Sequence, residues 1–143
     1  MAKTKNLSPG VKSKTFACLW RSMFIIALGY PVKTLPKKEQ VQKIRHLKEF
    51  YASLIKVLPC KFCRDFCREL QRDLPLQYTS RKALMFSIYR WKHEVNKKLI
   101  RQERAGPNMG WGKTKPSPPF CQIEKRYLRM VAKGCSKTVG RCV

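Results

Sequence analysis

Two cysteines separated by two residues, Cys60 and Cys63, are the side chains of this sequence best suited to chemistry. They follow Pro59 at the point where a helix-like apolar pattern begins, so we expect the pair at the start of a helix. Because the thiolate is the reactive form of cysteine, the positive end of that helix and the neighbouring Lys61 and Arg64 should lower the thiol pKa. The pair is therefore predicted to form and break disulfides.

The same spacing also supplies half of a zinc site, so spacing alone leaves a second hypothesis open. A zinc-stabilised basic module that binds nucleic acid would use as its ligands Cys60, Cys63, Cys67 and His93. Three of these ligands fall on one predicted helix and the fourth on a distant one, and the sequence has no second Cys-x-x-Cys and no His-x-x-x-His motif. The redox interpretation is favoured.

Composition indicates one globular domain with a strongly basic surface. The 143 residues are 43% hydrophobic and 10% aromatic, enough for an ordinary core. Lys and Arg number 32 against 8 Asp and Glu, and this net charge of +24 attracts phosphates and acidic protein surfaces. Nucleic acid or an acidic partner is thus a hypothesis from charge alone. Seven cysteines, an odd number, indicate a chain that handles disulfides.

Neither a membrane span nor a signal peptide is predicted. No segment reaches the roughly 20 apolar residues that cross a bilayer. The apolar run 23–28 lies behind Trp20-Arg21 and is not followed by a small-residue cleavage site.

Apolar residues recur at three- and four-residue steps along most of the chain, and we find no alternating strand pattern. The fold class predicted is all-α, a four-helix bundle with a short fifth helix. The expected helices run from Thr15 to Pro31, from Pro36 to Leu58, from the cysteine pair to Asp73, from Thr79 or Ser80 past Leu99, and, shorter, between Cys121 and Cys135. The expected division is a flexible basic arm at 1–14, a helical domain at 15–135 with a Gly/Pro-rich linker at 105–119, and a mobile tail at 136–143.

Four segments add a further signal by their order. They are Trp20-x-x-x-Phe24 with Tyr30-Pro31, then 58–64, then 94–99, then Pro119-Phe120-Cys121 with Lys125-Arg126-Tyr127. Together they resemble the Erv/ALR family of FAD-linked sulfhydryl oxidases over residues 16–135. The resemblance implies a bundle that holds FAD noncovalently, with Cys63 beside the flavin and Cys60 exchanging disulfides with the incoming thiol. It also implies oxidation of thiol-containing protein substrates, with a thioredoxin-like relay protein as one candidate, and transfer of electrons to dioxygen to give hydrogen peroxide.

The resemblance further implies which residues bind FAD, and it implies no metal. The cofactor-binding positions carried over are Trp20, Phe24, Lys92, His93, Val95, Asn96, Lys98, Arg126 and Tyr127. Phe24 and Lys92 depart from the family, which usually has histidine at both positions. A phenylalanine at the first of them resembles the poxviral branch.

Small size and the poxvirus-like step from Trp20 to Phe24 predict a protein of a large DNA virus, located in the virion or host cytoplasm. Otherwise we expect an oxidising compartment such as the mitochondrial intermembrane space. The resemblance also implies a homodimer through the first helices and a disulfide between Cys121 and Cys135 on the fifth helix. For the other cysteines, Cys142 is a candidate shuttle or intermolecular bridge, and the apolar neighbours of Cys18 and Cys67 predict inert buried thiols.

Overall fold

The computed structural model describes residues 9–105 and 114–138. Within these ranges the chain forms five helices and no strand, which confirms the all-α prediction. The helices are α1 (Pro9–Ala27), α2 (Lys37–Val57), α3 (Lys61–Asp73), α4 (Arg81–Ala105) and α5 (Phe120–Thr138). None of the helices in the described part of the chain is long and apolar enough to cross a membrane.

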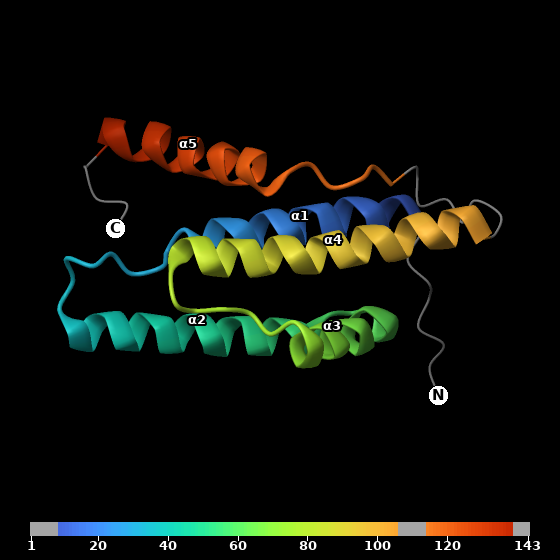
Figure 1. The fold of residues 1–143 in the computed structure, drawn as a ribbon, viewed down its shortest axis with the longest axis horizontal. Coiled ribbons are helices and arrows are strands. Elements are labelled where there is room, and N and C mark those ends of the chain that lie inside the picture. The colour runs from blue at the N-terminus through green and yellow to red at the C-terminus, as the bar shows by residue number, and fades with distance from the viewer. Residues whose placement is uncertain (1–8, 106–113, 139–143) are drawn as a thin grey trace.

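The helices lie in three layers (Figure 1). The middle layer is α1 beside α4, the layer below it holds α2 and α3, and α5 covers the upper side of the α1–α4 pair. The chain reverses between α2 and α3 at residues 58–60, so the cysteine pair lies at one end of the lower layer.

Two elements differ from the sequence-based expectation. α1 already begins at Pro9, so residues 9–14 of the expected basic arm are helical, whereas residues 1–8 lie outside the described ranges. Proline is well accepted at a first helical position because its missing N–H would have no partner there. The fifth helix is not short, since α5 has 19 residues and passes through Gly134, while α3 with 13 residues is the shortest. A glycine inside a helix lowers its stability by about 1 kcal/mol without ending it.

A single apolar core joins the three layers. Its fully or nearly fully buried members include Met23, Phe24, Ala27, Leu47, Tyr51, Ile55, Leu70, Leu84, Met85, Ile88, Trp91, Ile123 and Tyr127. Two polar groups of buried side chains also form hydrogen bonds of 2.7 Å between elements. The Tyr51 hydroxyl donates to the Met23 carbonyl, and the Trp91 indole N–H donates to the Leu74 carbonyl. These bonds fix α2 against α1, and α4 against the end of α3.

Candidate redox site

The turn between α2 and α3 holds both cysteines of the pair in place. Cys60 is the N-cap residue of α3, with an extended backbone at φ −93° and ψ 119°. Its sulfur accepts the backbone N–H of Cys63 at 3.3 Å, and its carbonyl accepts the N–H of Arg64 at 3.0 Å. The predicted position of the pair at the start of a helix is confirmed.

The cations next to the pair are not directed at the sulfurs in the way that the sequence suggested. The Arg64 guanidinium donates to the Leu58 carbonyl, which ties the start of α3 back to the end of the turn. The Lys61 side chain is exposed to solvent. Arg64 therefore stabilises the turn rather than pairing with a thiolate.

The pKa of the thiols moves opposite to our expectation. Burial, then the hydrogen bond to Cys60 and the charges of Cys60 and Cys67, raises the pKa of the Cys63 thiol to about 12. Burial and the charge of Cys60 raise the pKa of Cys67 to about 11. The expected lowering is thus wrong for Cys63, because half-buried thiols gathered on one helix disfavour a further negative charge. At neutral pH both groups are protonated thiols.

Three cysteines share one face of α3, since Cys60, Cys63 and Cys67 follow each other at steps of three and four residues. All three are half-buried free thiols, so the described state is reduced. Among the described residues no group of three or more His, Cys, Asp or Glu side chains could hold a metal ion. Because this part of the chain includes His93, the hypothesis of a zinc-stabilised module is wrong: the fourth ligand does not join the three cysteines.

The remaining cysteines also correct earlier expectations. Cys18 is exposed rather than buried, while Cys67 packs partly against the core. Cys121 and Cys135 lie 14 residues apart on one continuous helix, which separates them by roughly 21 Å at 1.5 Å per residue. A disulfide needs Cα atoms no more than about 7 Å apart, so this pair cannot bridge within one chain. Cys142 lies outside the described residues.

Several predicted cofactor-binding residues converge where α1, α4 and α5 meet. Phe24 of α1 stacks on Tyr127 of α5 with ring centroids 5.0 Å apart, and both rings are buried in the core. Lys92 of α4 is half-buried, and its pKa is lowered by burial and then by the positive charges of Arg126 and Arg21. Three helices therefore bring three cations toward one place.

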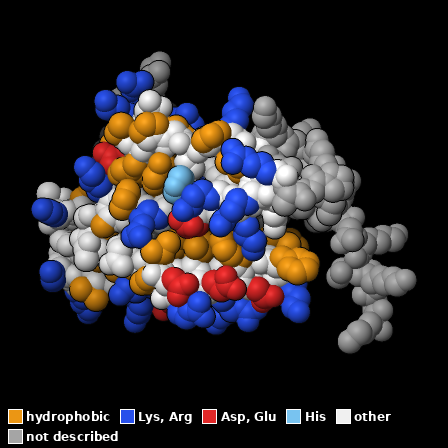
Figure 2. Space-filling view, turned by 45° about the vertical axis from the view of Figure 1, so that its right-hand side comes forward, with side chains coloured by type: hydrophobic (Ala, Val, Ile, Leu, Met, Phe, Trp, Pro, Cys, Tyr) orange, Lys and Arg blue, Asp and Glu red, His pale blue; other side chains and the backbone are white. Residues whose placement is uncertain are grey.

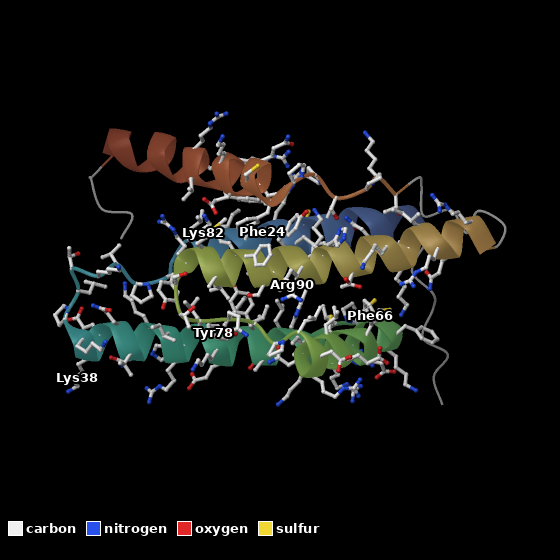
Figure 3. The ribbon with its side chains drawn as sticks, in the orientation of Figure 1. Phe24, Lys38, Phe66, Tyr78, Lys82 and Arg90 are labelled. Atoms are coloured by element: carbon white, nitrogen blue, oxygen red, sulfur yellow. The ribbon has the colours of Figure 1, made fainter. Side chains whose placement is uncertain are left out.

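The other predicted residues lie on two further faces of α4. On the face covered by the segment before α5, His93 stacks on Tyr89 at 6.2 Å, and the Asn96 amide donates to the Ser117 hydroxyl at 2.9 Å. The His93 Nδ1 atom is buried without a hydrogen-bond partner among the described residues. On the face toward α3, the Lys98 ammonium lies 4.1 Å from the centre of the Phe66 ring (Figure 3).

The structure thus brings some of the predicted cofactor-binding residues together, but not all of them. Phe24, Lys92, Arg126 and Tyr127 lie together, Trp20 and Val95 pack partly buried against the core, and Lys98 lies toward the helix of the cysteine pair. Arg21 was missed by the sequence analysis. Its position directly after Trp20 in the first motif was the available signal, but many exposed arginines in a basic chain look alike in sequence.

Comparison with known proteins adds an independent result. The profile of the Erv1 / Alr family matches residues 17–114, a span that includes the cysteine pair. The FAD-linked sulfhydryl oxidase ERV1 of Arabidopsis thaliana is 26% identical over 125 residues, which cover 85% of this chain and 62% of that protein. The chain thus spans less than two thirds of this relative, and no solved structure matches. Because the family profile covers more than half of the sequence, the chain belongs to the Erv1/Alr family.

Proposed function

We propose that the protein is an FAD-dependent thiol oxidase that forms disulfide bonds in protein substrates. The observation that carries this proposal is the Cys60–Cys63 pair, fixed at the N-terminus of α3 inside the span that matches the family. The relative from Arabidopsis thaliana, named as an FAD-linked sulfhydryl oxidase, supports the same activity.

The residues present fit FAD. The cations Arg21, Lys92 and Arg126 converge, and among the described residues none of them has a carboxylate within ion-pair distance, which suits a pyrophosphate. The orphaned Nδ1 atom of His93 also offers a polar contact that the protein itself leaves unused.

We assign the other contacts to the flavin on the basis of their chemistry. Trp20, Phe24, Val95 and Tyr127 would supply apolar contacts to the rings, and Asn96 and Lys98 polar ones. When bound, FAD would supply the two-electron acceptor for the reduced Cys60–Cys63 pair, with dioxygen as the final oxidant and hydrogen peroxide as the product.

The protein's own residues carry out the exchange with substrate. A substrate thiolate attacks the Cys60 sulfur of the oxidised pair, a substrate–Cys60 disulfide forms, and Cys63 leaves with the electron pair of the broken bond. A second substrate thiolate then attacks the substrate sulfur of the mixed disulfide. This releases the substrate disulfide and Cys60, and protons from the two substrate thiols account for the reduced pair. Because its pKa is raised, the Cys63 thiolate takes up one of these protons once it has left.

Purified protein tests this proposal directly. We expect about one flavin per chain in the absorbance spectrum and peroxide release when dithiothreitol is added. Cys63→Ser should abolish peroxide release while the protein stays yellow, and Cys18→Ser, at an exposed cysteine on another helix, is the matched control. A colourless protein that releases no peroxide even after incubation with FAD would overturn the proposal.

We further propose a homodimer that associates through α1. Cys18, Ser22 and Ile25 are exposed and follow each other at steps of three or four residues, so they share one face of this helix. Origin in a large DNA virus, with the protein in virions or host cytoplasm, remains part of the proposal and is supported by the small size and Phe24. Failure to detect the protein in purified virions or infected cytoplasm would count against it.

A further inference from the structure

A basic groove lies between α2 and α3. Its volume is about 630 Å³. The residues that define it here are Lys48, Ile55 and Lys56 of α2, Arg64 and Arg68 of α3, and Tyr78. We call it the α2–α3 groove. None of the residues carried over from the family as FAD contacts lines it.

The lining of the α2–α3 groove contains cations but no carboxylate. The Lys48 ammonium lies 5.5 Å from the centre of the Tyr78 ring, and within the described ranges neither Lys48 nor Lys56 has an ion-pair partner. Arg68 is paired with Asp65, which is not part of the lining. Lys48 and Lys56 are therefore the groove charges that lack compensation.

The neighbouring edge of the molecule has the opposite charge. α3 carries three of the eight carboxylates of the chain, Asp65, Glu69 and Asp73, at four-residue steps along one face. Figure 2 shows red side chains gathered in a row near the lower edge of the molecule, with Lys and Arg side chains directly below them and others among the hydrophobic side chains above. Asp65 and Asp73 of this row are paired with Arg68 and Arg72, so the uncompensated charge that attracts an acidic ligand lies in the α2–α3 groove.

The α2–α3 groove lies beside the row of α3 that begins with Cys60, although Cys60 itself is not part of the lining. Arg64 and Arg68 follow Cys60 at four-residue steps, so they continue its row along α3 on the groove side. Cys63 shares the face of Cys60 but lies nearer its core edge, since it precedes the buried Leu70 by two turns. A segment in the groove is therefore held next to Cys60 rather than Cys63.

Exposed apolar side chains flank the same sulfur. Val57 is 73% exposed just before Cys60, and Phe62 is 80% exposed just after it. Large apolar side chains this exposed beside a reactive group are typical of an interaction surface. They offer a contact for the apolar neighbours of a substrate cysteine, with the cations of the groove further along.

We propose that the α2–α3 groove binds an acidic segment of the protein substrate adjacent to its reactive cysteines, and so selects acidic thiol proteins. This inference rests on the proposed oxidase function and adds the class of substrate. Charge complementarity identifies the occupant, because two uncompensated lysines and two arginines surround a space large enough for several peptide residues.

The test compares two synthetic dithiol peptides on the flavin-loaded full chain. One has glutamates flanking its cysteines, and the other has glutamines in their place. We expect kcat/KM for the acidic peptide to exceed that for the neutral one by about tenfold at low salt, mainly through KM, and the ratio to fall toward one at high salt. The double variant Lys48→Glu/Lys56→Glu should bring the ratio to one or below.

The matched control is Lys37→Glu/Lys38→Glu, which makes the same charge change at the other end of α2, where Figure 3 labels Lys38. This control should keep the wild-type ratio. If dithiothreitol yields peroxide but the wild-type ratio is one at every salt concentration, the groove proposal fails while the oxidase stands. If no dithiol is oxidised, the proposed function fails first.

Two other outcomes would also overturn the groove proposal. Loss of bound flavin in a folded Lys48→Glu/Lys56→Glu protein would assign the groove to the cofactor. Binding of a DNA duplex that this variant abolishes, together with a peptide ratio of one, would assign it to nucleic acid. If the variant does not fold, Lys48→Gln/Lys56→Gln removes both charges without reversing them and should still lower the ratio several-fold, and an unchanged ratio would overturn the proposal.

Discussion

Cys60 and Cys63 are one helical turn apart but have different surroundings. Cys60 caps α3 on the groove side, whereas burial and the nearby cysteines raise the pKa of Cys63 to about 12. In the reduced protein we expect iodoacetamide to label Cys63 at least about a hundredfold more slowly at neutral pH than Cys121, an exposed cysteine outside the proposed dimer interface, because the thiolate fraction drops tenfold per pKa unit. Peptide mass spectrometry after timed labelling measures both rates. Equal rates would show that the pKa of Cys63 is not raised.

Raised thiol pKa values also make the stability of the reduced protein depend on pH. Cys63 and Cys67 hold their protons up to about pH 12 and 11 when folded, against an ordinary value of 9.0. Their contribution is therefore complete below about pH 9 and is lost as the pH rises through the folded values. Urea midpoints should fall more steeply between about pH 9 and 11 for the reduced protein than for the one with a Cys60–Cys63 disulfide. Tyr78, whose pKa is raised to about 12, affects both forms alike. Parallel curves would contradict this prediction.

At the residue scale, sequence reasoning located the chemistry but misjudged its electrostatics. The spacing of Cys60 and Cys63 after a proline sufficed to place them at a helix start. The Arg64 side chain donates to the Leu58 carbonyl. This direction depends on the path of the turn, so the spacing of residues in the sequence does not predict it. The Cys121–Cys135 pairing failed for a related reason, since the length of α5 decides the distance between them.

At the element scale, periodicity predicted α1, α2 and α4 because each of them buries apolar residues at helical spacing, whereas α3 fully buries only Leu70. On α4 the predicted Leu84, Ile88 and Trp91 are all buried. The ends were less predictable: α1 starts earlier than expected and α5 ends later. No sequence pattern indicated that Lys92 of α4 would meet Arg126 and Arg21 from two other helices, because that depends on how the layers pack.

One hydrogen bond between elements lends itself to a direct test. The buried Tyr51 hydroxyl donates to the Met23 carbonyl at 2.7 Å and joins α2 to α1. Tyr51→Phe keeps the ring and removes this bond, while the Met23 carbonyl keeps its partner within α1, so we expect a loss of about 0.5–1.5 kcal/mol in the free energy of unfolding. Urea denaturation measures it. Tyr30→Phe, which removes the less buried bond to the Tyr78 carbonyl, is the control and should lose less. Equal losses would show that burial of the Met23 carbonyl is unimportant.

At the scale of the whole molecule, the net charge of +24 was available from the sequence, but its distribution was not. The structure divides the charge among the cations where α1, α4 and α5 meet, the α2–α3 groove and the acidic row of α3. We assign the first region to a pyrophosphate and the second to an acidic substrate segment. We assign no ligand to the acidic row. Composition predicts only that anions bind, because it does not record which cations share a surface.

The same charge makes a specific prediction about self-association. Two copies that meet through α1 repel each other, because each carries a net charge of +24, so added salt should strengthen the homodimer. Salt should weaken binding of the acidic peptide, so the two effects have opposite signs. Sedimentation at low and high salt measures the first.

The apolar contact proposed for this dimer is Ile25, which is 52% exposed on α1. Ile25→Asp places a charge in that interface and should shift the protein to monomer at every salt concentration. Val41→Asp is the matched control, since Val41 is 58% exposed on α2 and lies outside the proposed interface. A dimer that survives Ile25→Asp, or that Val41→Asp disrupts equally, would show that α1 is not the dimer interface. If added salt weakens the dimer, attraction between unlike charges must hold it together. The interface would then include some of the few carboxylates, three of which lie on α3.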